Sequence, residues 1–237
     1  MAEVRSNDSY NSFCPVAKAC EIIEPRWTLL VLCELWQGST RFNEIRRGIP
    51  GISPTLLSKR LKDMERRGLV RRTELEGGEA GYATTPLADG LAPMVQALGK
   101  WAHHNIDVEV SLKKLDARLL MWNIRRKIDT SALPHGKTSV VQFTYPELAE
   151  EERHYWLVAR PGRPVDLCLL DPGHDVDLFI RANLKAMTAA WMGWSSLRTE
   201  IAANRINLVG DQKLIMRLEK WMVTSGYARQ AEQRAVA

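Results

Sequence analysis

Several features that mark other protein classes are missing from this chain of 237 residues. No apolar run approaches the roughly 20 residues that a helix needs to span a bilayer. The polar stretch from Met1 to Tyr10 lacks the basic start and apolar run of a signal peptide. Internal repeats and low-complexity tracts are absent as well. We therefore expect a cytoplasmic globular protein that does not attach to a membrane.

Cysteine is scarce, and none of the four forms a C-x-x-C pair. Disulfides are rare in the cytosol, so we expect four free thiols. Cys33 and Cys168 lie in apolar runs, which predicts buried side chains. Cys14, near a predicted helix start, is the thiol with a prospect of reactivity.

The signatures of common enzyme sites are also missing. The chain contains no G-x-G-x-x-G, no G-x-x-x-x-G-K-[ST] and no H-E-x-x-H. The adjacent His103 and His104 point to different faces of a helix and cannot chelate one metal. His174 and Asp175 follow a turn, with no nucleophile at a recognisable spacing. We therefore expect a protein that is not an enzyme, with no catalytic residues, no metal and no cofactor.

The positive charge is concentrated locally. The chain has a net charge of +5 and a pI near 9.1, yet residues 1–112 hold 14 basic and 14 acidic residues. Between Arg41 and Arg72, however, ten basic residues stand against three acidic ones. Such a cluster within one segment is typical of a nucleic-acid contact.

The first half is predicted to be mainly helical. Helices are expected over 16–23, 27–36 and 41–47, and Ser53-Pro54 opens a fourth that ends at Gly68. Two strands, 69–75 and 82–85, flank a glycine-rich turn. Thr85-Pro86 then opens a long helix to about residue 109. This order predicts a winged helix-turn-helix domain over residues 1–112.

The second half predicts an α+β domain over residues 113–237. Its expected order is one helix, four strands, two helices, a strand and a final helix. The expected ranges are 112–128, 138–145, 155–160, 165–170, 176–180, 182–192, 196–203, 207–209 and 212–223. Strands that come first and helices that follow favour a small sheet with flanking helices over a doubly wound sheet.

The fourth helix has two contrasting faces at 100° per residue. Leu57, Leu61 and Met64 form an apolar stripe, and a hydroxyl-and-basic face without acids lies opposite. Such a face suits the major groove, although a charged face can also be merely solvated. The hairpin tip carries three glutamates that would repel DNA unless they point away. The predicted DNA contacts are Ser53, Thr55, Ser58, Lys59, Lys62 and Arg66, with Arg46, Arg47, Arg71 and Arg72 beside them.

Three segments closely resemble the HxlR type of bacterial and archaeal regulators. They are C-P-V-A-K-A-C-E-I-I-E-P-R-W-T-L-L-V-L-C-E-L (14–35), the run R-F-N-E-I-R-R-G-I-P-G-I-S-P-T-L-L-S-K-R-L-K-D-M-E-R-R-G-L-V (41–70) and Y-A-T-T-P-L-A-D-G-L (82–91). The resemblance covers residues 12–107 and departs from the family at Pro25 and Thr84. It implies a dimeric winged-helix regulator that binds a pseudo-palindromic operator in double-stranded DNA.

The resemblance further implies dimerisation through terminal helices. The long helix carries an apolar stripe that includes Leu91, Met94, Leu98 and Trp101, which supports this expectation. The stripe could instead pack on its own domain or on the C-terminal one. Some members of the family sense oxidants or electrophiles through a cysteine near the position of Cys14. The sequence nevertheless favours an inert thiol, because Cys-Pro at this place is common even in members with no redox role.

Residues 118–225 resemble a sterol-carrier-type domain, mainly through D-V-D-L-F-I-R-A-N-L-K-A-M-T-A-A-W-M-G-W-S-S-L (175–197) and I-N-L-V-G-D (206–211). That fold encloses an apolar tunnel, which implies a lipid-like or other apolar effector. The same side chains could simply form a core. An alternative function is a lipid or small-molecule carrier that uses its first half only to dimerise. The candidate pocket residues are Trp122, Phe143, Trp156, Leu167, Leu169, Phe179, Met187 and Trp191.

Overall fold

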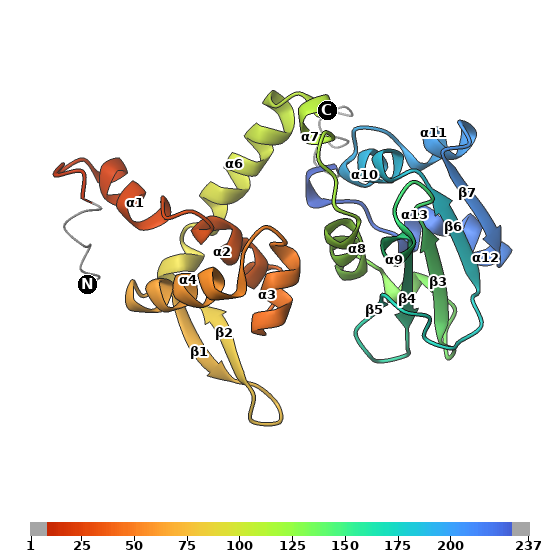
Figure 1. The fold of residues 1–237 in the computed structure, drawn as a ribbon, viewed down its shortest axis with the longest axis horizontal. Coiled ribbons are helices and arrows are strands. Elements are labelled where there is room, and N and C mark those ends of the chain that lie inside the picture. The colour runs from red at the N-terminus through yellow and green to blue at the C-terminus, as the bar shows by residue number, and fades with distance from the viewer. Residues whose placement is uncertain (1–8, 229–237) are drawn as a thin grey trace. The chain divides into compact units, whose positions relative to one another are not determined.

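The computed structural model describes residues 9–228, which divide into two compact units (Figure 1). Unit 1 ends at Trp101 and unit 2 begins at Ala102, whereas the sequence analysis expected the division after residue 112. The difference arises because the segment after residue 105 is tied to unit 2. There, Lys185 forms an ion pair with Glu109 at 2.7 Å.

Unit 1 has the expected order of elements. Four helices precede a two-stranded antiparallel hairpin, and two helices follow it. The four helices before the hairpin begin within two residues of their predicted starts, and the first helix after it begins at Pro86, as Thr85-Pro86 predicted. The elements are α1 (Pro15–Ile23), α2 (Thr28–Trp36), α3 (Phe42–Gly48), α4 (Pro54–Arg66), β1 (Val70–Glu74), β2 (Ala80–Thr84), α5 (Pro86–Asp89) and α6 (Ala92–Asn105).

The long helix predicted from residue 86 to about 109 is wrong, because three helices cover this stretch. Gly90 caps α5 after a single turn, and α6 starts afresh at Ala92. The chain leaves α6 after Asn105. Asp107 then caps α7 (Val108–Ser111) by accepting a hydrogen bond from the Glu109 amide at 2.7 Å. A capping aspartate satisfies a free helix N–H, so it favours a new helix over a continuous one.

Unit 2 contains a five-stranded mixed sheet in the order β5-β4-β3-β6-β7, in which β3 and β6 are parallel and the other pairs antiparallel. Its strands are β3 (Ser139–Thr144), β4 (His154–Ala159), β5 (Asp166–Cys168), β6 (Leu178–Ala182) and β7 (Ile206–Gly210). Its helices after α7 are α8 (Ala117–Arg126), α9 (Glu150–Arg153), α10 (Leu184–Met192), α11 (Leu197–Ala202), α12 (Gln212–Met216) and α13 (Leu218–Trp221).

Two helix predictions in unit 2 need correction. The helix expected over 112–128 begins only at Ala117, where the Asp116 side chain accepts from the Leu119 amide at 3.0 Å. The helix expected over 212–223 is divided at Arg217 into α12 and α13. The sequence analysis also missed α9 and the 3-10 turn at Thr130–Ala132.

The helices of unit 2 cover one face of its sheet. Side chains from α8, α10, α11, α12 and α13 pack with alternate residues of β3, β4, β6 and β7 in one large core. The opposite face carries a smaller cluster of Val140, Trp156 and Val158. The α+β prediction of a small sheet with flanking helices is therefore confirmed at the level of architecture.

Within residues 9–228, no helix is both long and apolar enough to cross a membrane. The same stretch brings together no group of three His, Cys, Asp or Glu side chains that could hold a metal ion.

Candidate nucleic-acid interface

Helix α4 is anchored at both ends by its own sequence. The Ser53 hydroxyl accepts a hydrogen bond from the Leu56 amide at 3.2 Å, and Pro54 occupies the first helical position. Gly68 ends the segment with a φ of +71°, a conformation that glycine adopts without a steric penalty. The helix is thus held in register by short-range chemistry.

The apolar stripe of α4 is buried as predicted. Leu57, Leu61 and Met64 are at most 1% exposed and pack in the core of unit 1. At about 1.5–3 kcal/mol for each fully buried side chain, this stripe fixes which face of α4 points outward. The outward positions are exposed or half-buried: Ser53, Thr55, Ser58, Lys59, Lys62 and Arg66.

Both acids of α4 are engaged by arginines. Asp63 forms ion pairs with Arg60 and Arg66, and Glu65 pairs with Arg72 on β1 at 3.5 Å. Two of the predicted DNA contacts, Arg66 and Arg72, are therefore shared with carboxylates. In the part of the chain that the structure describes, Lys59 and Lys62 form no ion pair, so their ammonium groups remain available on the exposed face.

The remaining predicted contacts flank α4. Arg46 and Arg47 are exposed in the last turn of α3, and Arg71 is exposed on β1. The hairpin pairs Val70 with Thr84 at its base and turns through Gly77 and Gly78, both with positive φ. This tight turn forms the tip of the β1–β2 hairpin, which is the wing of the helix-turn-helix domain.

The acidic wing tip has a basic partner that the sequence analysis missed. Arg41, just before α3, binds the Glu79 carboxylate through Nε at 2.8 Å, and this contact raises the pKa of the Arg41 guanidinium. The Tyr82 amide also donates to the Thr40 carbonyl at 2.8 Å. One of the three wing glutamates is thus neutralised. The partners are 38 residues apart, and no local pattern links them.

The comparisons with known proteins match this half of the chain. Residues 22–110 match the family model described as HxlR-like helix-turn-helix. The HTH-type transcriptional regulator YvaP of Bacillus subtilis is 36% identical over 100 residues, which are 41% of this chain and 93% of YvaP. The chain belongs to the HxlR-like helix-turn-helix family.

Two further relatives are similar over the same share of the chain. The HTH-type transcriptional regulator YodB of Bacillus subtilis is 33% identical over 95 residues, or 39% of this chain and 85% of YodB. The solved structure of the redox regulator HypR in its oxidized form is 29% identical, with a TM-score of 0.37. The similarity covers 40% of this chain and 99% of HypR.

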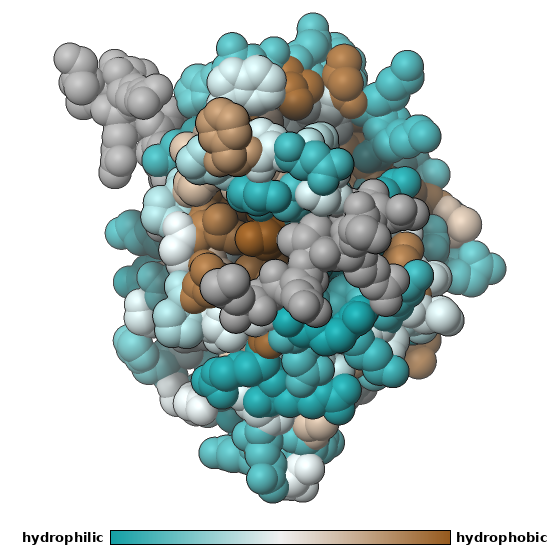
Figure 2. Space-filling view, turned by 90° about the vertical axis from the view of Figure 1, so that its left-hand side faces the viewer, coloured by the Kyte–Doolittle hydropathy of each residue, from teal (hydrophilic) through white to brown (hydrophobic). Residues whose placement is uncertain are grey.

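The HxlR-like domain exposes apolar side chains on α6. Met94, Leu98 and Trp101 are 58%, 52% and 59% exposed, whereas Leu91 packs partly against the core of unit 1. The predicted stripe therefore has two parts: Leu91 packs on its own domain, and the other three side chains are exposed. Phe13, before α1, and Val16 within it are also exposed, at 99% and 69%. Figure 2 looks onto the side of unit 1 and shows hydrophobic patches above a mostly hydrophilic lower surface.

Cys14 is exposed at the start of α1. The nearby backbone amides of Ala17 and Val16 lower the pKa of its thiol. Burial instead raises the pKa of Cys33 and of Cys168. The ordering agrees with the physical expectation that free helix N–H groups stabilise a thiolate.

The predicted pocket residues of unit 2 do not gather in one place. Phe143 and Met187 are buried in the large core, with Leu167 and Trp191 at its margin. Trp156 lies in the cluster on the opposite face of the sheet. The eight residues cannot line one cavity, because successive strand residues point to opposite faces. Of the others, Trp122 is buried with Arg125 and Arg126 over its ring, and Leu169 and Phe179 are half-exposed.

Proposed function

We propose that this HxlR-like protein is a sequence-specific transcriptional regulator that inserts α4 into the major groove of an operator. The charge balance of α4 carries the proposal: its acids are held by arginines, while Lys59 and Lys62 remain on the exposed face. Short hydroxyls on the same face reach base edges, and lysines reach guanine or phosphate. Arg46, Arg47, Arg71 and Arg72 are proposed to contact the phosphate backbone on either side.

A salt titration of DNA binding tests this placement. Operators are first selected from a random double-stranded library with the full chain, and affinity is then measured by fluorescence anisotropy at several salt concentrations. The double variant Lys59→Ala/Lys62→Ala should bind more weakly. It should also flatten the log–log salt slope by about 1.8, since each lost phosphate contact removes about 0.9.

A matched control removes the same charge elsewhere. Lys113→Ala/Lys114→Ala takes two exposed lysines from unit 2 and should leave the slope unchanged. If the α4 variant kept the wild-type affinity and slope, the groove placement would be refuted. If the wild-type chain selected no operator at all, the alternative carrier function would gain support instead.

The regulator is proposed to act as a homodimer on a pseudo-palindromic site. The exposed Met94, Leu98 and Trp101 on α6 support this, since adjoining large apolar side chains favour a protein contact. A two-fold dimer presents two α4 helices to half-sites about one helical turn, or a multiple of it, apart.

Unit 2 is proposed to bind an apolar, lipid-like small-molecule effector that modulates DNA binding. The helices packed on one face of its sheet support the resemblance to sterol-carrier-type domains, whose interior is apolar. Helix α6 holds residues of both units and offers a route for coupling. Near its end, within unit 2, His103 stacks on Trp194 at 5.4 Å and its Nε2 lies 3.0 Å from the Met192 carbonyl oxygen. The effector would have to favour one arrangement of the α4 helices over another.

Cys14 is proposed as a redox-sensitive thiol of the same regulator. Its exposure and lowered pKa support this role, because the thiolate is the form that oxidants attack.

A further inference from the structure

The sheet of unit 2 has two contrasting edges (Figure 1). At one edge, β5 has three residues and carries Asp166, which pairs with Arg160. At the other edge, β7 has five residues, and neither a charged residue nor a proline is among them. Short strands and charged side chains are common protections of a sheet edge against pairing with another chain. β5 has both protections, and β7 has neither.

Two hydrogen bonds fix how β7 faces its neighbour β6. Just before β7, the Asn183 amide donates to the Arg205 carbonyl at 2.9 Å, and just after it the Asp211 amide donates to the Asp177 carbonyl at 2.8 Å. In an antiparallel pair, residues that exchange such bonds alternate with residues whose main-chain groups point away from the neighbour. Between these two ends, the odd-numbered residues of β7 therefore bond to β6, and the even-numbered residues direct their N–H and C=O outward.

Leu208 and Gly210 form the open part of this edge. Ile206, the other even-numbered residue of β7, is 0% exposed, whereas Leu208 is half-buried and Gly210 is exposed. The N–H and C=O groups of Leu208 and Gly210 have no hydrogen-bond partner within residues 9–228. A strand edge with free main-chain groups is a template on which another strand can pair.

The side chain between these two residues is apolar and exposed. Val209 is 68% exposed and lies directly opposite Phe179 of β6, which is 45% exposed. Both lie on the sheet face that the helices leave open, because the register aligns Phe179 with Gln142, and Gln142 with Trp156 of the smaller cluster. Adjoining apolar side chains beside an open edge favour a contact with another protein chain.

The open edge is complementary to a second copy of itself. Leu208 and Gly210 lie on either side of Val209, so a two-fold axis at Val209 places each Leu208 opposite Gly210 of the second copy. All the free N–H and C=O groups of both residues then find partners across the axis. A glycine opposite each leucine also leaves room for the larger side chain. An unrelated strand would not share this symmetry.

The same axis brings apolar side chains together. Val209 meets Val209 of the second copy in a non-hydrogen-bonded pair, in which opposite side chains approach most closely. Phe179 of each copy lies beside this pair. Asn207 falls opposite Asp211 of the second copy, so an amide faces a carboxylate and no like charges face each other there.

From these observations we propose that two copies of this chain pair edge to edge through β7, about a two-fold axis at Val209. The contact is separate from the one proposed on α6, and it does not depend on DNA recognition. Because it involves few residues, it belongs to the small, weak class of interfaces. It therefore joins copies that are already held close together, such as regulator dimers bound at neighbouring operators.

Charge exchange at Val209 tests the two-fold pairing. The full chain carries Leu98→Asp/Trp101→Asp to remove the contact proposed on α6, and sedimentation equilibrium follows association from about 10 µM to about 1 mM, the range of a weak contact. We expect a monomer at the low end and a dimer at the high end. Val209→Lys or Val209→Glu alone should weaken this dimer roughly tenfold or more, because like charges then face each other. An equal mixture of the two variants should restore it, because lysine then faces glutamate.

A control variant and a local probe locate the contact. Leu170→Lys adds a charge at another exposed position, 83% exposed, and should leave the association unchanged. Thermal melting at low concentration checks that the Val209 variants are folded, which their exposed position favours. Amide hydrogen exchange of Leu208 and Gly210 should slow as the concentration rises. Exchange of Val209 should not change, because its amide already bonds to β6.

Four results would overturn the proposal. They are a chain that stays monomeric up to the highest concentration, association that either charged variant leaves intact, a mixture that does not restore it, and exchange of Leu208 and Gly210 that does not depend on concentration. None of them alters the operator titration, so failure of the β7 contact and failure of DNA binding are distinguishable.

Discussion

Gly48 occupies a position in the helix-turn-helix where even one methyl group has no room. It is the last residue of α3, and a Cβ built there would lie 1.8 Å from Cδ of Glu34 and 2.0 Å from its Oε2. Glu34, on α2, is 4% exposed, and its Oε2 accepts a hydrogen bond from the Ser39 hydroxyl at 2.9 Å. Gly48→Ala must therefore displace a buried carboxylate.

The expected cost follows from two contributions. Overpacking of a well-filled site costs about 1–3 kcal/mol, and a lost hydrogen bond to a charged acceptor adds about 1.5–3 kcal/mol. We expect Gly48→Ala to lower the free energy of unfolding of unit 1 by roughly 2–5 kcal/mol, because the glutamate chain can yield in part. Hydrogen exchange of α2 and α3 peptides should then accelerate by about 30-fold or more, at 1.4 kcal/mol per factor of ten.

A second glycine supplies the matched control. Gly90 has φ and ψ of −61° and −22°, and a Cβ there would make only an ordinary contact, 3.5 Å from the Leu87 carbonyl oxygen. Gly90→Ala should leave exchange unchanged or slow it. In a Glu34→Ala background, Gly48→Ala should cost much less, because the clashing carboxylate is gone. Equal acceleration by the two glycine variants, or no rescue by Glu34→Ala, would refute the reasoning.

Two more predictions concern assembly and thiol chemistry. The double variant Leu98→Asp/Trp101→Asp should sediment as a monomer in sedimentation velocity. The control Leu170→Asp, at a position 83% exposed in unit 2, should sediment as the wild type does. A folded dimer of the double variant would show that the interface lies elsewhere. Iodoacetamide should label Cys14 before Cys33 and Cys168, because a lowered pKa leaves more thiolate at neutral pH and a raised pKa leaves less. Peptide mass spectrometry at successive times identifies the labelled cysteine. Labelling of Cys33 before Cys14 would contradict this order.

Local chemistry made unit 1 readable from its sequence. Ser53 and Thr85 each cap a helix and each precede a proline, so both starts could be predicted to the residue. The spacing of the apolar residues in α4 predicted its buried stripe, and it therefore also predicted that Lys59 and Lys62 are exposed. Two features depended on distant partners and escaped prediction: the Arg41–Glu79 ion pair and the packing of Leu91 against its own core.

Unit 2 was harder to read because its central strands are buried on both faces. In β4, Tyr155, Trp156 and Leu157 are consecutive and all buried. Their sequence therefore shows no alternation of apolar and polar residues from which the two faces of the strand could be told apart. Tyr155 and Leu157 belong to the large core, and Trp156 lies on the other side. A set of apolar residues chosen by type alone therefore mixes two faces of one sheet.

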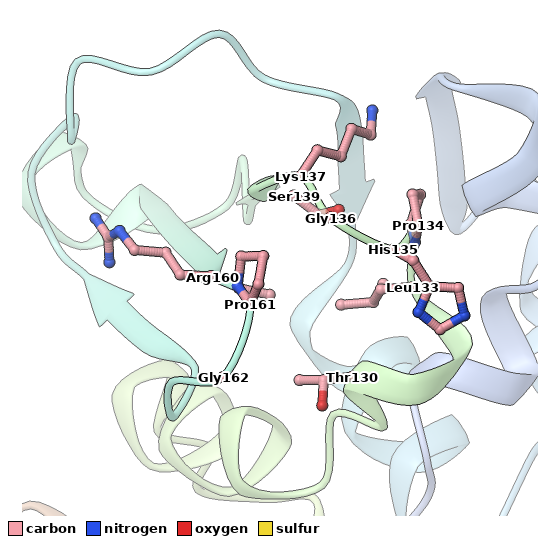
Figure 3. Close-up of a pocket in the computed structure, with 11 residues that line it drawn as sticks. Thr130, Leu133, Pro134, His135, Gly136, Lys137, Ser139, Arg160, Pro161 and Gly162 are labelled. Atoms are coloured by element: carbon pink, nitrogen blue, oxygen red, sulfur yellow. The ribbon is translucent and has the colours of Figure 1, made fainter.

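The lining of one pocket in unit 2 (Figure 3) shows what strand register adds to a sequence, because it includes Ser139 on β3 and Ala159 on β4. Its two walls come from segments about 25 residues apart, and only the pairing of Ser139 with Ala159 brings them together. Within each segment the residues suggest nothing beyond a turn, since Pro134 and Gly136 on one side and Pro161 and Gly162 on the other are ordinary turn formers. Ser139 itself becomes buried, at 2% exposed, only once β3 and β4 pair. Shifting the register by one residue would turn the Ser139 side chain to the opposite face of the sheet, so these lining residues come together only through the strand pairing of the folded protein.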